Sequence, residues 1–429
     1  MKIFRIFSVL LVLLSILLSS CSAATETPTP TKAPPPMGAI LSQDIENSFQ
    51  WLQANALMAD KVDWADLRKE AAILKPELAV STDMYPILCK ALRQLRDANA
   101  WLFVPDLETP GFASDYLTLT PEYTLVAWVM PDSDAEKAGL QTGDVIKGVN
   151  GKPVQPYNPD NLWVPCNTVP LDDSPQEVLD ILREGQPMTI TIERKTYQYS
   201  DPLYLPTGRN LEAGSGTAGY FELPTASGYY ESFPGEVQKL MKELDSNPVC
   251  GWIIDLRRTF SGDFWYYMGA VGSLLETELP GGFAYRDGTH DIWAYRDQEV
   301  FWGEISMPEG LLVGEGYVPK HVPVALLISP GTQAASELLV VAFSGRTDLR
   351  TFGEPTFGLP TLVTQKPLLD GSRLFVSGAY SYDRNQTTFD GPIVPDVTVQ
   401  TNWGQFGSDQ DMVVRSAVDW LSTQSTCQQ

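Results

Sequence analysis

The stretch from Val324 to Leu339 is the part of the sequence best suited to hold a reactive side chain. Its apolar first half predicts a buried strand, Pro330 and Gly331 end that run, and small residues then lead into a helical pattern. A strand that turns sharply into a helix can hold a nucleophile clear of the backbone, and the first amides of the helix can stabilise an oxyanion. The chemistry that such a corner supports is acyl transfer.

The order of residues at this corner resembles the nucleophile motif Thr-x-Ser-x-x-Glu of the tail-specific, or C-terminal-processing, serine peptidases and their tricorn-core relatives. Thr332 and Glu337 match the motif, whereas Ala334 stands at the position of the serine. The general base of the family is a lysine in one branch and a histidine of an Asp-x-His-Thr motif in another. The matching positions hold Leu359 and Asn99. Because acyl transfer needs a nucleophile and a base, the resemblance predicts a member that has lost catalytic activity.

The same resemblance assigns an oxyanion hole to Gly262 and to the amide of Ala335. Ser336 is a weak alternative nucleophile. Its hydroxyl is expected to point about 200° around the helix axis from Ala334, and no base is expected beside it. A small residue at the start of the helix is the favoured interpretation of Ser336.

The elements that position the corner resemble the α/β crotonase-like (ClpP-like) core of the family over residues 201–429. Gly219 to Pro224 matches its first strand, and Gly251 to Arg257 matches a strand that ends in Asp-Leu-Arg. Beyond the corner, Gly353 to Leu359 and Gly391 to Val397 match two further motifs. The fold class expected for the whole chain is therefore α/β multidomain.

Residues 107–200 resemble the PDZ domains of bacterial processing proteases, which are β-rich with helices. Ser133 to Leu140 predicts a short helix, and Asn150-Gly151 predicts a tight hairpin. Ser174 to Leu182 is expected to form a helix and Met188 to Ile192 a strand. PDZ domains usually hold a peptide C-terminus as an added strand, but the usual glycine-rich carboxylate loop is not found, so peptide binding by this domain stays open.

Residues 39–106 predict a helical unit at the N-terminal side of the PDZ domain. Apolar residues recur at helical spacing from Ile45 to Leu52. Asp63 is expected to cap a second helix, and Ser81 or Thr82 a third.

Residues 1–20 resemble a bacterial lipoprotein signal peptide, with a charged start and an apolar run too short to span a bilayer comfortably. Cys21 follows that run and is expected to be lipidated. Residues 21–38 form a Thr/Pro-rich linker that cannot build a core. The expected location is the bacterial cell envelope, outside the cytoplasm, with membrane contact through the lipid anchor only.

Charge and composition narrow the class of partner. The chain of 429 residues carries a net charge of −23, which makes nucleic acid an improbable partner. No cofactor or metal is expected, since the sequence holds only 2 histidines and no metal-ligand spacing. Export permits disulfides, but the spacing does not choose among the three pairings open to four cysteines, namely Cys89, Cys166, Cys250 and Cys427.

The function predicted from these features is the binding of peptides or exported proteins without cleavage. One alternative is an active serine endopeptidase with an unrecognised nucleophile and base. Another is a structural lipoprotein that binds a partner without using a peptide cleft.

Overall fold

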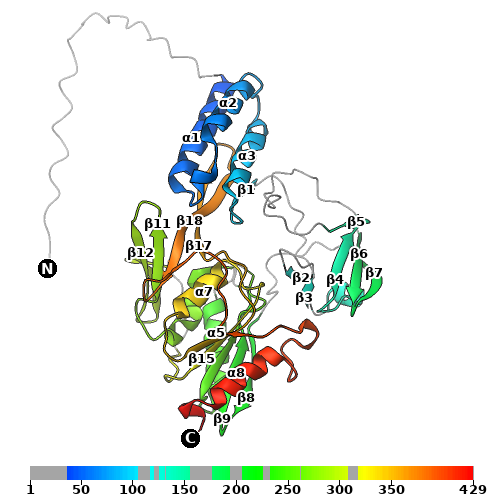
Figure 1. The fold of residues 1–429 in the computed structure, drawn as a ribbon, viewed down its shortest axis with the longest axis vertical. Helices are drawn as coiled ribbons and strands as arrows, with labels where there is room; N and C mark the ends of the chain where they lie inside the picture. Colours follow the sequence, from blue (N-terminus) through cyan, green and yellow to red (C-terminus); the bar gives the residue numbers. More distant parts are fainter. Residues whose placement is uncertain are drawn as a thin grey trace, which may run out of the picture. The chain divides into compact units, whose positions relative to one another are not determined.

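A computed structural model describes most of the chain beyond the linker (Figure 1). The described residues are 36–104, 116–119, 125–130, 132–154, 176–193, 205–225, 232–260, 262–307 and 317–428. The predicted signal peptide, Cys21, nearly all of the linker and Cys166 lie outside them. No described helix combines the length and the apolar character that crossing a bilayer requires.

Three helices form the N-terminal unit: α1 (Met37–Asn55), α2 (Trp64–Leu74) and α3 (Tyr85–Leu95). The periodic apolar residues of α1 are buried against α2 and α3, as the spacing predicted. Asp63 caps α2 as expected, because its carboxylate accepts the amide of Asp66 at 3.0 Å.

The predicted cap of α3 is wrong. Ser81 and Thr82 lie in a 3-10 turn, Ser81–Met84, and α3 begins after it. The carboxylate of Asp83 accepts the amides of Ala79 and Val80 instead. Pro86, which has no amide hydrogen to leave unpaired, occupies the first turn of α3.

The PDZ region contributes an antiparallel sheet in the order β2-β3-β4-β6-β7, with β5 paired to β4. Ser133 caps the short helix α4, and the apolar side chains of the sheet form a core of their own. The elements are β2 (Tyr116–Leu119), β3 (Leu125–Val129), α4 (Asp134–Lys137), β4 (Val145–Val149), β5 (Lys152–Pro153), β6 (Gln176–Arg183) and β7 (Gln186–Glu193).

The helix predicted over Ser174 to Leu182 is wrong, since residues 176–183 form strand β6. Leu179 and Ile181 are buried two residues apart, which is strand periodicity. Glu184 and Gly185 both have positive φ and make the two-residue turn into β7. The strand predicted over Met188 to Ile192 is confirmed within β7.

The α/β core is built on a six-stranded sheet in the order β20-β16-β15-β10-β9-β8, in which only β8 runs antiparallel to its neighbour. The strands are β8 (Thr207–Ala213), β9 (Gly216–Glu222), β10 (Gly251–Asp255), β15 (Val324–Ile328), β16 (Leu349–Gly353) and β20 (Val397–Thr398). Every residue of β10 and β15 is buried, because helices cover both faces of the sheet.

Helices α5 (Phe233–Leu244), α6 (Phe264–Val271) and α7 (Ala335–Phe343) pack on one face of this sheet, and α8 (Met412–Ser422) packs on the other. Trp252 of β10 contributes to the first core cluster and the adjacent Ile253 to the second, as alternation along a strand requires. A disulfide joins Cys250 to Cys427, with 5.0 Å between their Cα atoms, and attaches the end of the chain to this sheet.

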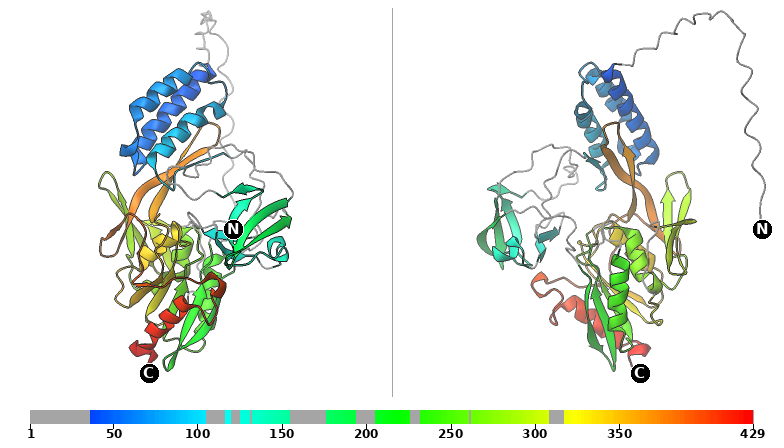
Figure 2. Two further views of the ribbon diagram at one scale, coloured as in Figure 1. Left: turned by 45° about the vertical axis from the view of Figure 1, so that its right-hand side comes forward. Right: turned by 180° about the vertical axis from the view of Figure 1, so that it is seen from behind.

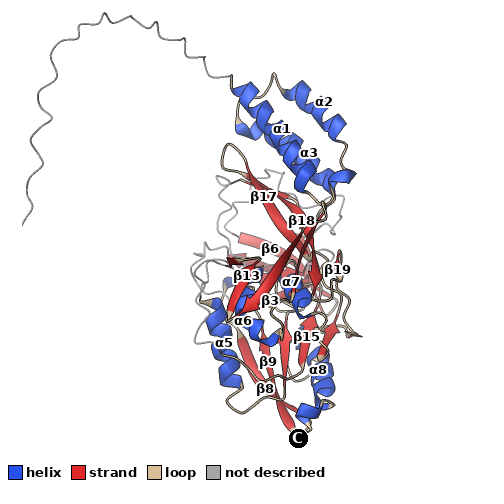
Figure 3. Cartoon of the chain, turned by 90° about the vertical axis from the view of Figure 1, so that its left-hand side faces the viewer, coloured by secondary structure: helices blue, strands red, loops and turns tan. Residues whose placement is uncertain are grey.

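A second sheet is organised around β18 (Arg373–Asp383), which runs from the helical unit to the core (Figures 2 and 3). Its residues Leu374 and Val376 pack with the helices, and Ala379 packs with the α/β core. The remaining strands are β1 (Trp101–Phe103), β11 (Gly281–Tyr285), β12 (His290–Arg296), β13 (Glu299–Trp302), β14 (Ile305–Ser306), β17 (Thr361–Pro367) and β19 (Thr388–Phe389).

Candidate active site

Ala334 occupies a strained corner between β15 and α7. Its φ of 49° and ψ of −107° are outside the regions that residues with a Cβ atom favour, and such a conformation costs about 1–3 kcal/mol. The corner is tied to the loop after β10: the Thr332 hydroxyl donates to the carbonyl of Leu256 at 2.8 Å, and the Ser329 hydroxyl donates to that of Arg257 at 2.7 Å. The backbone therefore has the conformation of a nucleophile corner, with a methyl group at its tip.

Glu337 connects this corner to the loop that contains Leu359. One oxygen of the buried carboxylate accepts the amides of Ala334 at 2.9 Å and Leu359 at 2.7 Å. The other accepts the hydroxyl of Thr356 at 2.5 Å and the amide of Gly358 at 2.7 Å. Burial raises the pKa of Glu337, and the four donors oppose that increase in part. The two family positions predicted for nucleophile and lysine are thus brought together.

Asn99 joins the same neighbourhood through its side-chain amide. Its Nδ2 donates to the hydroxyls of Thr361 at 3.0 Å and Ser377 at 3.2 Å. The amide of Thr361 donates to the carbonyl of Leu359 at 2.8 Å, so hydrogen bonds run continuously from Ala334 to Asn99. An uncharged carboxamide cannot take a proton from a nucleophile as a histidine does.

Asp97 lies behind Asn99 and was not predicted as a site residue. Its buried carboxylate accepts the amide and the hydroxyl of Ser377 at 2.6 and 2.8 Å, and the amide of Asn99 at 2.9 Å. Burial raises the pKa of Asp97, and the hydrogen bonds oppose the increase. The available signal was its place at the start of the stretch that aligns Asn99 with Asp-x-His-Thr.

The hydroxyl of Ser336 is buried and forms hydrogen bonds within the fold. It accepts the amide of Gln333 at 2.9 Å, and it lies 2.6 Å from the carbonyl oxygen of Thr259, to which it donates. These bonds hold the start of α7 to the loop after β10. A hydroxyl directed at that loop is not presented to a substrate beside Ala334.

The two positions assigned to an oxyanion hole lie on adjacent segments. Ala335 is the first residue of α7, and Gly262 follows the loop in which Phe260 pairs with Gln333. Gly262 has a φ of 97°, which glycine adopts without strain. Both positions therefore border the corner.

The Asp-Leu-Arg motif has a structural role. Arg257 is fully buried, and its Nη2 lies 2.6 Å from Asp255 and 2.7 Å from Asp411. Asp411 also caps α8 through the amide of Val413 at 3.0 Å. The motif therefore anchors the helix on the far face of the sheet.

A cluster of Glu276, His321 and Asp348 has the spacing of metal ligands. Arg346 already supplies a cation there: its Nη2 lies 3.0 Å from Glu276, and its Nε lies 2.8 Å from Asp348. The arrangement fits an ion-pair network around a buried guanidinium.

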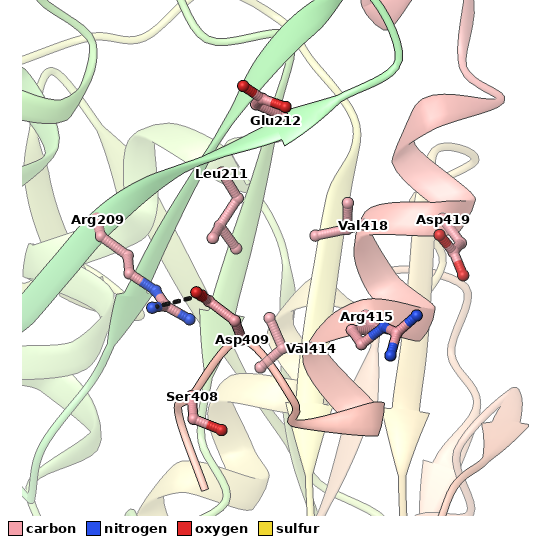
Figure 4. Close-up of a pocket in the computed structure, with 9 residues that line it drawn as sticks. All are labelled: Arg209, Leu211, Glu212, Ser408, Asp409, Val414, Arg415, Val418 and Asp419. Carbon is pink, nitrogen blue, oxygen red and sulfur yellow. Dashed lines mark ion pairs between the residues drawn. The ribbon is translucent and has the colours of Figure 1, made fainter. Parts of the chain in front are cut away.

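A cavity of about 180 Å³ lies between β8 and α8, on the face of the sheet opposite α7 (Figure 4). Leu211, Val414 and Val418 face one another in it, and Arg209 pairs with Asp409 at 3.0 Å. None of the predicted site residues lines this cavity, so it is separate from the corner at Ala334.

These elements define a multidomain α/β protein with a peptidase-type core and a separate antiparallel sheet of PDZ type. Residues 217–399 match the model of peptidase family S41, and residues 125–162 match that of the PDZ domain. Residues 217–399 therefore form a domain of peptidase family S41, and the predicted resemblance to the tail-specific serine peptidases and the predicted fold class are confirmed.

Two relatives illustrate the range of the similarity. The chain is 23% identical over 320 residues to the carboxyl-terminal-processing protease of Synechocystis. The aligned region covers 71% of this chain and 67% of that protein. It is 28% identical over 189 residues to the nisin-resistance protein of Lactococcus lactis, covering 43% and 54%. The second match thus spans about half of each protein.

Solved structures share the fold at low sequence identity. The photosystem II D1 C-terminal processing protease superposes with a TM-score of 0.57 at 19% identity, over 84% of this chain and 93% of that one. A lipoprotein from Streptococcus agalactiae gives a TM-score of 0.55 at 15% identity, over 92% and 99%.

Proposed function

We propose that this protein binds extended peptide segments of exported proteins without cleaving them, as a lipid-anchored protein outside the cytoplasm. The observation that carries the proposal is Ala334: a corner with the backbone of a nucleophile site ends in a methyl group. A methyl group cannot form an acyl intermediate. The backbone of the nucleophile corner is kept while the reactive group is absent, which favours binding over turnover.

The residues opposite the corner support the same proposal. Leu359 has no titratable group, and the amide of Asn99 is engaged by two hydroxyls. A peptidase site without its nucleophile and base keeps only roughly 10³–10⁴-fold acceleration over water. This remaining acceleration is too small for useful proteolysis.

The direct test is turnover and labelling of the full mature chain in detergent micelles. We expect no hydrolysis of fluorogenic peptides or casein and no labelling by a fluorophosphonate probe. The double variant Ala334→Ser with Leu359→Lys is the matched control, since it restores the family's Ser–Lys pair at positions that already share the Glu337 carboxylate. Labelling of this variant alone would support the proposal.

The alternative of an active serine peptidase has a second candidate nucleophile besides Ser336, the Ser377 hydroxyl beside Asp97. Both residues are buried, which disfavours attack on a peptide. If the wild-type chain is labelled and Ser377→Ala or Ser336→Ala abolishes the label, the non-cleaving proposal is wrong.

The lipid anchor is tested separately at Cys21. Metabolic labelling with palmitate is expected to mark the wild-type protein and to spare Cys21→Ser. Equal labelling of both proteins would contradict the anchor without affecting the peptide-binding proposal.

A further inference from the structure

The part of the second sheet formed by β1, β18 and β17 has two different faces. Leu102 pairs with Leu374 across β1 and β18, and both are buried against the N-terminal helices. On the opposite face Trp101 pairs with Phe375, and Phe103 pairs with Arg373. One face is thus covered by α1 and α3, and the other carries aromatic rings.

Among the described residues, the rings on the face away from the helices are arranged as a continuous surface. Trp101 and Phe375 are stacked, with ring centroids 4.2 Å apart and planes at 10°. Phe103 meets Trp101 edge to face at 6.1 Å and 85°. Phe103 is 39% exposed and Val363, on the same face of β17, is 38% exposed. We call Trp101, Phe103, Phe375 and Val363 the aromatic track.

The aromatic track is continuous with the candidate active site. Val363 is opposite Ser377, and Phe375 lies two residues before Ser377 on the same face of β18. Trp101 follows Asn99 by two residues, and Asn99 donates to Ser377 and Thr361. The face therefore begins with polar groups next to Leu359 and continues outward as apolar rings. Arg373 and Gln365, which are opposite Phe103 and Phe375 and share a hydrogen bond of 3.1 Å, border the rings.

The chemistry of the track selects one class of occupant. Its four side chains offer flat or branched apolar surfaces and only one polar atom, the indole nitrogen of Trp101. A contiguous exposed apolar surface of this kind marks a binding site more often than scattered single residues do. The net charge of −23 disfavours strongly acidic segments. An extended peptide with aromatic or large aliphatic side chains fits these conditions.

We propose that the aromatic track is the side-chain subsite for the peptides that this protein binds, and that it selects aromatic or large aliphatic residues. The proposal rests on the proposed function and specifies its ligand. The polar groups of Asn99 and Thr361 lie at the inner end of the track, and the rings of Trp101 and Phe103 lie at its outer part. The bound peptide runs over this face toward the corner at Ala334.

The test compares two short peptides of glycine, serine and threonine, one with a central Phe-Leu-Phe and one with Ser-Ser-Ser. Both are acetylated and amidated, which removes the terminal carboxylate that a PDZ domain would hold. Fluorescence anisotropy with the full mature chain in micelles is expected to show tighter binding of the Phe-Leu-Phe peptide. Phe103→Ser is expected to weaken that binding by about tenfold or more.

Phe103 is the residue of choice because it is the most exposed ring of the track, so its replacement disturbs folding least. Ile305→Ser is the matched control: Ile305 is an exposed strand residue, 67% accessible, on β14. Its affinity for both peptides is expected to equal that of the wild type. A thermal melt of each variant verifies that the compared proteins are folded.

The outcomes separate this inference from the proposed function. If the wild type binds the Phe-Leu-Phe peptide without cleaving it and Phe103→Ser binds equally well, the subsite is wrong and the proposed function stands. If the wild type cleaves the peptide and Phe103→Ser raises KM about tenfold, the subsite stands and the non-cleaving proposal fails. If the wild type binds neither peptide, or if Phe103→Ser converts a dimer into a monomer in sedimentation, the subsite is wrong.

Discussion

The corner at Ala334 and the aromatic track differ in chemistry: polar groups at the corner are hydrogen-bonded within the fold, whereas apolar side chains of the track are partly exposed. At the corner, polar groups are almost fully engaged: the Glu337 carboxylate takes four donors, and the Ser336 hydroxyl is bonded inside the fold. On the track, Phe103 and Val363 leave more than a third of their surfaces exposed. Hydrogen bonds thus fix the backbone where the reactive group is absent, and the proposed peptide subsite lies where apolar surface is exposed.

Removing the Glu337 carboxylate is expected to have the largest effect on stability of the changes considered. Glu337→Ala removes the acceptor of one buried and three partly buried donors, so the free energy of unfolding should fall by roughly 3–5 kcal/mol. Urea denaturation measures the loss. Glu243→Ala on the exposed side of α5 is the control, expected to stay within about 0.5 kcal/mol of the wild type. A wild-type midpoint for Glu337→Ala would show that the corner is not held by this carboxylate.

Breaking the disulfide tests whether the stability of the α/β core can be lowered without changing peptide binding at the aromatic track. Cys427→Ser opens a link between residues 177 positions apart, and the loss of such a link costs about 2–5 kcal/mol. Because neither Cys250 nor Cys427 touches the track, the folded variant should bind the Phe-Leu-Phe peptide as the wild type does. A stability equal to that of the wild type under oxidising conditions, or a changed affinity at a temperature where both are folded, would contradict this expectation.

Ala334→Gly is expected to have the smallest effect, and it tests whether the backbone at the corner is strained. Glycine adopts positive φ without the strain that a Cβ atom causes, so stability should rise by up to about 1 kcal/mol. Ala342→Gly within α7 is the control and should lower stability by about 1 kcal/mol. Thermal unfolding of both variants measures the difference, and a loss of stability in Ala334→Gly would argue against strain at this residue.

Local patterns sufficed for the elements that depend on their own residues. The buried strand before Pro330, the helix after it and the cap at Asp63 follow from apolar runs and short polar side chains. They were predicted correctly because neighbours in sequence determine them. The helix expected near Leu179 failed because pairing with β7, a tertiary contact, outweighed a pattern compatible with both structures.

The site was predictable only in part for the same reason. Substitution of the serine and of both bases is visible at Ala334, Leu359 and Asn99, because the amino-acid sequence gives these residue types directly. Asp97 and Ser377 are 280 positions apart, and no local signal pairs them. Their hydrogen bond exists because β18 extends from the core to the end of α3.

The sequence by itself determined which side chains are present, and therefore that the corner carries a methyl group with no base at the family positions. The tertiary structure alone decided that Trp101 and Phe375 stack on the face of the sheet away from the N-terminal helices and that the Glu337 carboxylate joins two distant loops. The physical reason is range: side-chain chemistry and local backbone preference act between near neighbours, whereas register and burial arise only when distant strands pair.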